Sequence, residues 1–178
     1  DRVVSFFEHR DKSLALMHCI AEYPTPAKNS NLNQIDLFRK RYPGHTIGYS
    51  THEGPDELTS IKLAVAKGAR IFEKHVGLET EQYKLNAYSA KPEQVYKWLK
   101  AAGEAFEYCG DHDERHTFSQ KETDDLRGLR RGVFARHDLK NGEKIETEDV
   151  FFAIPVGEGQ ITANDFSKYT EFRLLKDI

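Results

Sequence analysis

The sequence predicts an α/β fold, with a parallel β-sheet covered by helices and a small β-rich unit after it. Three short, mostly apolar runs read as strands, at residues 14–19, 46–49 and 69–73. A segment with helical periodicity follows each run. Alternation of strands and helices with short links favours a parallel sheet. Each run also leads to a histidine, so polar groups are expected together at one edge of that sheet.

The helices of the first part are marked by their ends and their apolar spacing. Pro43-Gly44 ends one helix, Pro55 and neighbouring acids open the next, and Gly68 suits the position after it. The expected helical ranges are 1–10, 31–42, 53–67 and 92–108. The residues expected to face the core are Leu32, Ile35, Leu37, Phe38, Leu58, Ile61, Leu63, Ala64, Val65, Val95, Trp98, Leu99, Ala102 and Phe106.

Composition changes sharply after residue 110. Polar and charged residues dominate 111–128, which we interpret as a linker. Short β-type pieces follow, and Asn141-Gly142 is a strong tight-turn signal. We therefore expect three parts: βα units at 1–110, the linker at 111–128, and a small, incomplete second domain at 129–178.

Composition excludes several classes of protein. The net charge of −3, without a basic run, gives no reason to expect nucleic acid as a partner. No apolar stretch approaches the roughly 20 residues that cross a bilayer, so no membrane partner is expected. Two cysteines are too few for a disulfide framework and fit the reducing cytoplasm, where we expect the protein. The ends of the chain look cut, which suggests a fragment.

The histidines at the strand ends are candidate metal ligands. We assign this role to His18 and His52, with His75 as a weaker third candidate. Imidazole suits Mn, Fe, Co or Zn, and two histidines leave positions open for water or substrate oxygens. The alternative is that each histidine is only a hydrogen-bonded structural group.

The residues beside these histidines are candidate site residues because side chains alternate along a strand. Ser50 shares a side with His52, although it is equally a helix-cap or loop hydroxyl. Glu73 shares a side with His75, whereas Lys74 points the other way and has an ion pair with a helix as its alternative role. Tyr23 either lines the pocket or packs on Pro24. We read Cys19 as a small buried core residue, since it alternates away from His18.

Four motifs in this order resemble the sialic acid synthase (N-acetylneuraminate synthase) family. In the first part they are Leu16-Met17-His18-Cys19, Tyr23-Pro24-Thr25-Pro26, Ile47-Gly48-Tyr49-Ser50-Thr51-His52, and Gly68-Ala69 followed by Glu73-Lys74-His75. Their spacing matches the last three strands of that family's (β/α)8 barrel. The tail from Arg131 to Val150 resembles its antifreeze-like (SAF) domain, so the implied fold is the C-terminal portion of a TIM barrel followed by a SAF domain.

The resemblance implies a reaction and a set of roles. The family condenses phosphoenolpyruvate with an amino-sugar-type aldose to a nine-carbon 2-keto acid and phosphate. It implies a divalent metal, typically Mn²⁺, on His18 and His52, and a domain-swapped homodimer. We expect Glu73 and His75 to be catalytic and Tyr23, Ser50, Lys74 and Asn86 to bind substrates.

The sequence departs from the family's pattern at three places. Thr51 stands where Asp is usual, residues 84–89 replace Gly-Pro-Asp-His before a Ser, and Ile154-Pro155-Val156-Gly157 replaces Arg-Pro-Gly. These departures suggest a different acceptor sugar. Three strands cannot close a barrel, so the chain alone is expected to be inactive. The alternatives are another metal-dependent aldolase or lyase, and a non-catalytic sugar-binding homologue.

Overall fold

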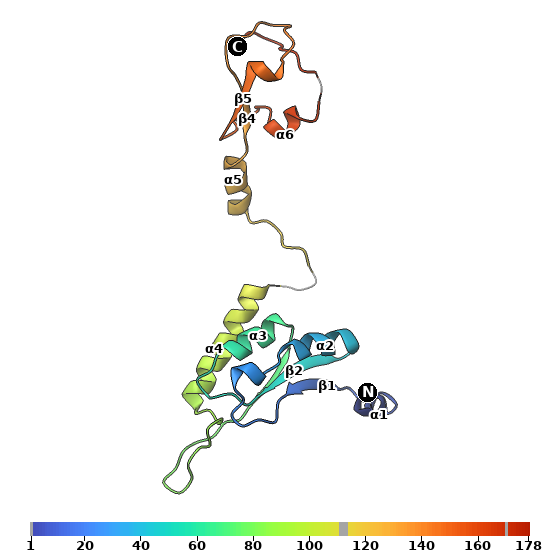
Figure 1. Cartoon of the computed structure of the whole chain (residues 1–178), viewed down its shortest axis with the longest axis vertical. Coiled ribbons are helices and arrows are strands. Elements are labelled where there is room, and N and C mark those ends of the chain that lie inside the picture. The colour runs from blue at the N-terminus through green and yellow to red at the C-terminus, as the bar shows by residue number, and fades with distance from the viewer. Residues whose placement is uncertain (1, 111–113, 170) are drawn as a thin grey trace. The chain divides into compact units, whose positions relative to one another are not determined.

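The computed structural model describes residues 2–110, 114–169 and 171–178. The chain divides into two compact units, residues 1–113 and 114–178 (Figure 1). No helix among the described residues is both long and apolar enough to cross a membrane.

Unit 1 is built on a three-stranded parallel sheet. Its strands are β1 (Ala15–Cys19), β2 (Thr46–Thr51) and β3 (Ile71–Lys74), in the order β1-β2-β3. The register pairs His18 with Tyr49, Cys19 with Ser50, and Ser50 with Glu73. The predicted parallel sheet is confirmed, and it fits part of a (β/α)8 barrel.

Helices cover one face of this sheet (Figure 1). The helices at 33–41 and 92–109 begin and end within two residues of their predicted ranges. The helix predicted at 53–67 instead begins at Thr59, so Pro55 and the neighbouring acids precede it. Glu57 accepts hydrogen bonds from the amides of Thr59 and Ser60 at the start of the helix at 59–66, and Pro92 opens the helix at 92–109. The helices of unit 1 are α1 (Arg2–Glu8), η1 (Ala27–Asn29), α2 (Asn33–Arg41), α3 (Thr59–Ala66) and α4 (Pro92–Cys109).

Two apolar clusters hold these layers together. One lies between α3 and α4 and contains Ile61, Val65, Trp98, Ala101, Ala102 and Ala105. The other joins α2 and α3 to the sheet through Ile35, Ile47, Tyr49, Ala64 and Ala69. The prediction was wrong for Leu37, Leu63, Leu99 and Phe106, whose side chains are 48%, 48%, 57% and 38% exposed. Each is next in sequence to a residue that does point toward the core. Apolar spacing alone therefore made the buried face of each helix too wide.

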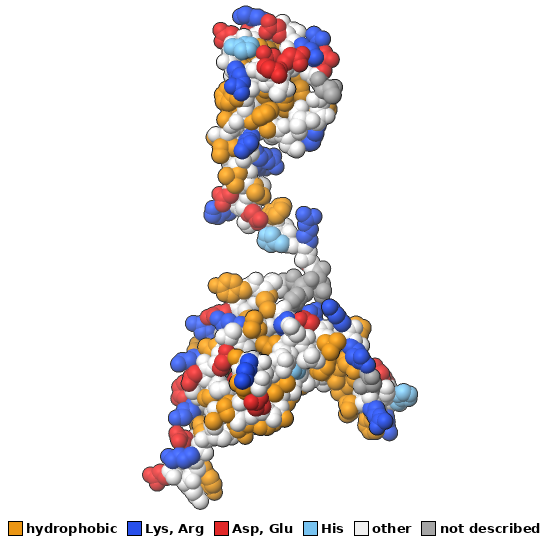
Figure 2. Space-filling view, viewed as in Figure 1, with side chains coloured by type: hydrophobic (Ala, Val, Ile, Leu, Met, Phe, Trp, Pro, Cys, Tyr) orange, Lys and Arg blue, Asp and Glu red, His pale blue; other side chains and the backbone are white. Residues whose placement is uncertain are grey.

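Unit 1 also exposes many large apolar side chains (Figure 2). They include Val3 and Phe6 on α1, Ile71 on β3, and Leu99 and Phe106 on α4. In the described residues both β1 and β3 are edge strands, which leaves backbone groups unpaired. Exposed apolar surface beside open sheet edges is typical of a contact surface.

Unit 2 is small and turn-rich. Its two strands, β4 (Gly132–Ala135) and β5 (Val150–Ala153), form an antiparallel pair. The short helices are α5 (Gln120–Gly128), η2 (Thr147–Asp149) and α6 (Ala163–Phe166). Gly142 has φ +84°, as the predicted Asn-Gly turn requires. The helix α5 lies inside the range predicted as a linker, where Ser119 caps its first turn; residues 111–113 of that range lie outside the described residues.

Gly48 allows the strands of unit 1 to approach closely. A Cβ at this position would lie 2.5 Å from the Ile71 carbonyl oxygen and would overlap the sulfur of Met17. The backbone oxygen cannot move without disturbing the β2–β3 pairing, so only glycine fits here.

Lys74 lies on the helix-covered face of the sheet. Its ammonium is buried, makes no hydrogen bond with any described residue, and lies 5.7 Å from the centre of the Trp98 ring. Desolvation lowers the pKa of this amine, although the nearby carboxylates of Glu53 and Glu57 oppose the shift. The burial of Lys74 therefore disfavours its charged form.

We expect Gly48→Ala to lower the free energy of unfolding by about 1–3 kcal/mol, because the added methyl overpacks the β2–β3 pair. Gly103→Ala is the control: it lies in α4 with open space around its Cβ position, and should gain roughly 0.5–1 kcal/mol. Urea unfolding of both variants measures the difference. Equal effects would contradict the close approach at Gly48.

We expect Lys74→Met to raise the thermal unfolding midpoint at neutral pH, because it removes a desolvated ammonium and keeps an apolar stem. The advantage should shrink as pH rises through the folded pKa of Lys74, since the wild-type amine then becomes neutral. Lys97→Met, on the exposed face of α4, is the control. A destabilised Lys74→Met variant would show that the ammonium is stabilising after all.

Candidate active site

The carboxyl ends of β1, β2 and β3 bring polar side chains to one edge of the sheet. Cys19, Ser50 and Glu73 lie on the face opposite the helices, and His52 and His75 follow the last two strands. In parallel βα folds this edge is where active sites are built. The described residues that meet here form the candidate active site.

Four rings form a cluster at this edge. The ring centres of His52 and His75 are 5.2 Å apart, and Tyr23 packs on His52 at 4.4 Å. Tyr88 joins them, at 4.9 Å from His75 and 5.1 Å from Tyr23. We call these residues (Tyr23, His52, His75 and Tyr88) the ring cluster.

His52 is held in one orientation by backbone groups. Its Nδ1 lies 2.9 Å from the Ile20 carbonyl oxygen, and its own carbonyl accepts a hydrogen bond from the Thr25 amide at 2.9 Å. Because a carbonyl only accepts, Nδ1 carries the hydrogen, and in the neutral imidazole Nε2 is then the nitrogen with the lone pair. The Cys19 sulfur lies 3.9 Å from the same Nδ1. This is the arrangement that prepares a histidine to bind a metal through Nε2.

The structure does not bring His18 and His52 together, although the sequence prediction paired them. His18 lies on the helix-covered face, where its ring stacks on Tyr49 at 5.8 Å and its Nε2 lies 2.8 Å from the Ser30 carbonyl oxygen. Cys19, predicted to be buried in the core, is instead exposed and lies beside His52. The reason is the register: Cys19 pairs with Ser50, so the face of the candidate site belongs to Cys19.

Ser50 and Glu73 lie together, on the shared face that alternation predicts. The Ser50 hydroxyl donates a hydrogen bond to Oε1 of Glu73 at 2.9 Å, and Thr51 donates to the Glu73 carbonyl at 3.1 Å. The Glu73 side chain is exposed, and its second carboxylate oxygen remains available to a ligand. Lys74, predicted to bind substrate, lies on the opposite face beside Trp98.

Asn86 shapes the loop after β3. Its Oδ1 accepts hydrogen bonds from the amides of Tyr88 and Ser89, at 3.1 and 2.8 Å. This turn positions Tyr88, and the Ala90 amide, bonded to the His75 carbonyl at 2.9 Å, ties the end of the loop to the sheet. Tyr88 was not predicted as a site residue. An aromatic residue within the polar stretch 79–89 was the available signal.

No group of three or more His, Cys, Asp or Glu side chains within residues 2–110, 114–169 and 171–178 is placed to hold a metal ion. The nearest arrangement is the pair His52 and His75, whose rings are inclined by 48°. Two neighbouring imidazoles suit a borderline divalent ion with open coordination positions, and the backbone hydrogen bond of His52 leaves its Nε2 for such an ion. The residues present therefore fit a metal held by this pair and completed by other ligands.

Comparisons with known proteins agree with this architecture. The chain is 28% identical over 190 residues to the N-acetylneuraminate-9-phosphate synthase of Drosophila melanogaster, covering 93% of this chain and 50% of that protein. It is 39% identical over 70 residues to the spore coat polysaccharide biosynthesis protein SpsE of Bacillus subtilis, covering 39% of this chain and 18% of that protein.

A solved structure of a Chromobacterium violaceum protein, named for spore coat polysaccharide biosynthesis, superposes with a TM-score of 0.86 at 51% identity. It covers all of this chain, which corresponds to 53% of that structure, so the chain spans about half the length of the relatives it matches. The family model described as the NeuB family matches residues 1–114, which contain the whole ring cluster. The chain therefore belongs to the NeuB family.

Proposed function

We propose that this chain forms part of a NeuB-type synthase that joins phosphoenolpyruvate to an amino-sugar-type aldose. The observation that carries the proposal is the set His52, His75, Glu73 and Ser50 at the carboxyl ends of strands in a NeuB-family domain. In the reaction, C3 of phosphoenolpyruvate bonds to the aldehyde carbon, water adds at C2, and the C2–O bond breaks to release phosphate. The product is a 2-keto acid of nine carbons when the aldose has six.

His52 and His75 would hold the divalent metal, with Mn²⁺ as the proposed ion. The support is their ring separation of 5.2 Å and the backbone hydrogen bond that leaves Nε2 of His52 free. When bound, such an ion polarises the aldehyde oxygen toward attack. This proposal replaces the pairing of His18 with His52, because His18 packs among the helices.

Glu73 and Ser50 would bind the substrate beside the histidines. The Ser50 hydroxyl holds one carboxylate oxygen of Glu73, so the other is directed to a substrate hydroxyl or to a water. Tyr23 and Tyr88 would form the apolar wall against which the sugar packs. Asn86 acts by positioning Tyr88.

The acceptor sugar is proposed to differ from N-acetylmannosamine. Residues 84–89 depart from the family's Gly-Pro-Asp-His pattern, and this same segment places the Tyr88 ring 4.9 Å from His75. A bulky ring next to the histidines narrows the space for an acceptor. The relatives named for spore coat polysaccharide biosynthesis are consistent with a synthase serving another polysaccharide.

A non-catalytic sugar-binding protein is the second candidate function. It is favoured by the lack of a third metal ligand beside His52 and His75 among the described residues. Release of phosphate from phosphoenolpyruvate separates the synthase from this candidate, and equally from an aldolase or lyase.

Three further features are proposed, and each of them depends on the proposed synthase function. Unit 2, with its β4–β5 pair, would be the antifreeze-like (SAF) domain. A domain-swapped homodimer would place that domain over the barrel of a second copy. The protein would work in the cytoplasm, without nucleic acid or membrane as partner.

We expect His52→Ala and His75→Ala, in the full-length protein, to lose bound Mn²⁺ and sugar-dependent phosphate release together. His18→Ala should keep the metal but lower the unfolding midpoint, because it removes a buried hydrogen bond and a stacked ring. Metal analysis, phosphate assays with an aldose panel, and thermal unfolding give the three readouts. Loss of metal in His18→Ala with retention in His75→Ala would restore the pairing predicted from the sequence.

We expect Tyr88→Ala to change which aldoses are accepted, with KM shifting more than kcat, because Tyr88 shapes the acceptor wall. Tyr83→Ala is the matched control, since Tyr83 lies in the same loop and is 67% exposed. It is not a member of the ring cluster. Steady-state kinetics over the same aldose panel decide the matter. Identical acceptor profiles for the two variants would exclude Tyr88 as a specificity residue.

A further inference from the structure

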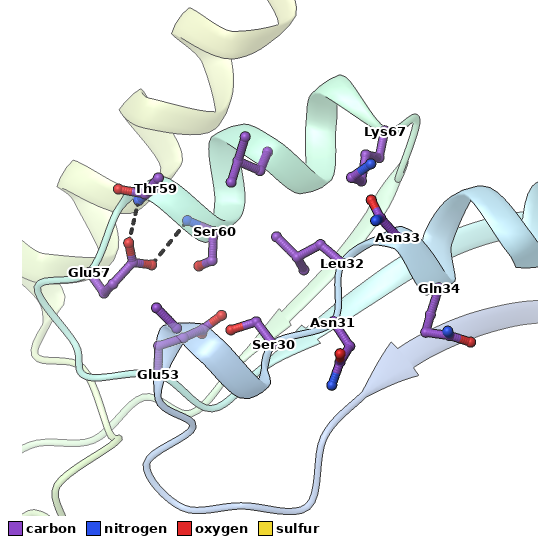
Figure 3. Close-up of a pocket in the computed structure, with 12 residues that line it drawn as sticks. Ser30, Asn31, Leu32, Asn33, Gln34, Glu53, Glu57, Thr59, Ser60 and Lys67 are labelled. Atoms are coloured by element: carbon purple, nitrogen blue, oxygen red, sulfur yellow. Dashed lines mark hydrogen bonds between the residues drawn. The ribbon is translucent and has the colours of Figure 1, made fainter.

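A second pocket lies between α2 and α3, on the helix-covered side of unit 1 (Figure 3). Its volume is about 530 Å³, within the range of small-molecule sites. None of its lining residues belongs to the ring cluster. The walls combine acidic and hydroxyl groups with the apolar side chains of Ala27, Leu32 and Leu63.

Two carboxylates stand at one end of this pocket. Glu53 is only 3% exposed, and its carboxylate accepts a hydrogen bond from the Tyr49 hydroxyl. Burial raises the pKa of that phenol, and the carboxylate beside it adds to the shift, so Tyr49 stays a neutral donor. The Glu57 carboxylate is held by the amides of Thr59 and Ser60, at 2.7 and 3.0 Å.

Ser60 supplies an unused acceptor at the same place. The residue is 6% exposed, and its hydroxyl makes no hydrogen bond with any residue that the structure describes, although it lies within electrostatic reach of the Tyr49 phenol and the Glu57 carboxylate. Figure 3 shows this hydroxyl directed into the space bounded by Glu57, Glu53 and Ser30. A buried hydroxyl without a partner costs free energy, so a ligand that pairs with it is favoured.

The charged groups around this space favour the binding of one further positive group. Lys67 at the rim is already paired with Asp36, at 2.7 Å. Lys74 lies close enough to Glu53 and Glu57 to feel both charges, yet its ammonium bonds to neither. Even with Lys74 fully charged, the two carboxylates exceed the positive charge beside them by one, and the burial that disfavours the charged form of Lys74 widens this difference.

We propose that this pocket binds a small molecule through a primary ammonium group. Its three N–H donors would reach the carboxylates of Glu53 and Glu57 and the hydroxyl of Ser60, and its short aliphatic part would pack on Leu32 and Leu63. A divalent metal ion fits less well, since only two carboxylates are present and Lys74 adds a positive charge nearby. The proposal does not depend on the synthase function.

The pocket is also connected to the candidate active site through the chain. Glu53 directly follows His52, whose carbonyl accepts the Thr25 amide. An amine bound at Glu53 would therefore contact the segment that orients a histidine of the ring cluster. Binding in the pocket could therefore change the orientation of His52, which makes the pocket a candidate regulatory site.

Calorimetric titration of the full-length protein with n-butylammonium tests the proposal. Tetramethylammonium carries the charge without N–H donors, and butanol carries the apolar chain without charge. We expect saturable binding of n-butylammonium alone. Ser60→Ala should weaken it about three- to tenfold, and Glu53→Gln or Glu57→Gln at least about tenfold, because each removes one acceptor.

Three variants separate an effect on binding from an effect on folding. Ser60→Ala should not lower the unfolding midpoint without ligand, since its hydroxyl bonds to no described residue. Lys74→Met should tighten binding, because it removes a competing positive charge. Ser89→Ala, outside the pocket, should change nothing. No saturable binding, equal affinity for tetramethylammonium or butanol, or unchanged affinity in Ser60→Ala would each overturn the proposal.

Discussion

The parallel pairing of β1, β2 and β3 is the constraint on which the rest of unit 1 depends. The pairing requires a glycine at position 48, where any Cβ would meet the Ile71 carbonyl and Met17. Once the register is set, alternation assigns every strand residue to one of two faces. Ser50 and Glu73 fall on the face of the candidate site, whereas Tyr49 and Lys74 fall beneath the helices.

The two faces then acquire different chemistry. The strand ends gather four rings and the Ser50–Glu73 pair, with Tyr23 and Glu73 exposed to solvent and His52 and Ser50 buried beneath them. The helix side buries the hydroxyl of Ser60 and the ammonium of Lys74, and neither makes a hydrogen bond with a residue that the structure describes. Unsatisfied groups of this kind are rare in folded proteins and point to a ligand or ordered water. The same β2 strand therefore leads into both sites.

Family membership indicates the class of reaction, whereas the geometry indicates which residues take part. Membership in the NeuB family narrows the chemistry to that of a synthase group, without identifying the acceptor. Geometry supports our proposal of His52 and His75, in place of His18, as the metal-binding pair, because their ring centres are 5.2 Å apart whereas His18 lies against the Ser30 carbonyl. The departure at residues 84–89 becomes interpretable because the loop returns Tyr88 to the histidines.

The sequence by itself determined the element order, the parallel sheet and the NeuB-like motifs, because periodicity, caps and turn residues are local signals. It also placed Ser50 and Glu73 on one face with their histidines. Only the tertiary structure decided that Cys19, and not His18, faces His52, since register depends on pairing between strands. Tyr88 and Ser60 likewise acquire meaning only through packing, the first through an Asn86 turn and the second through burial between helices.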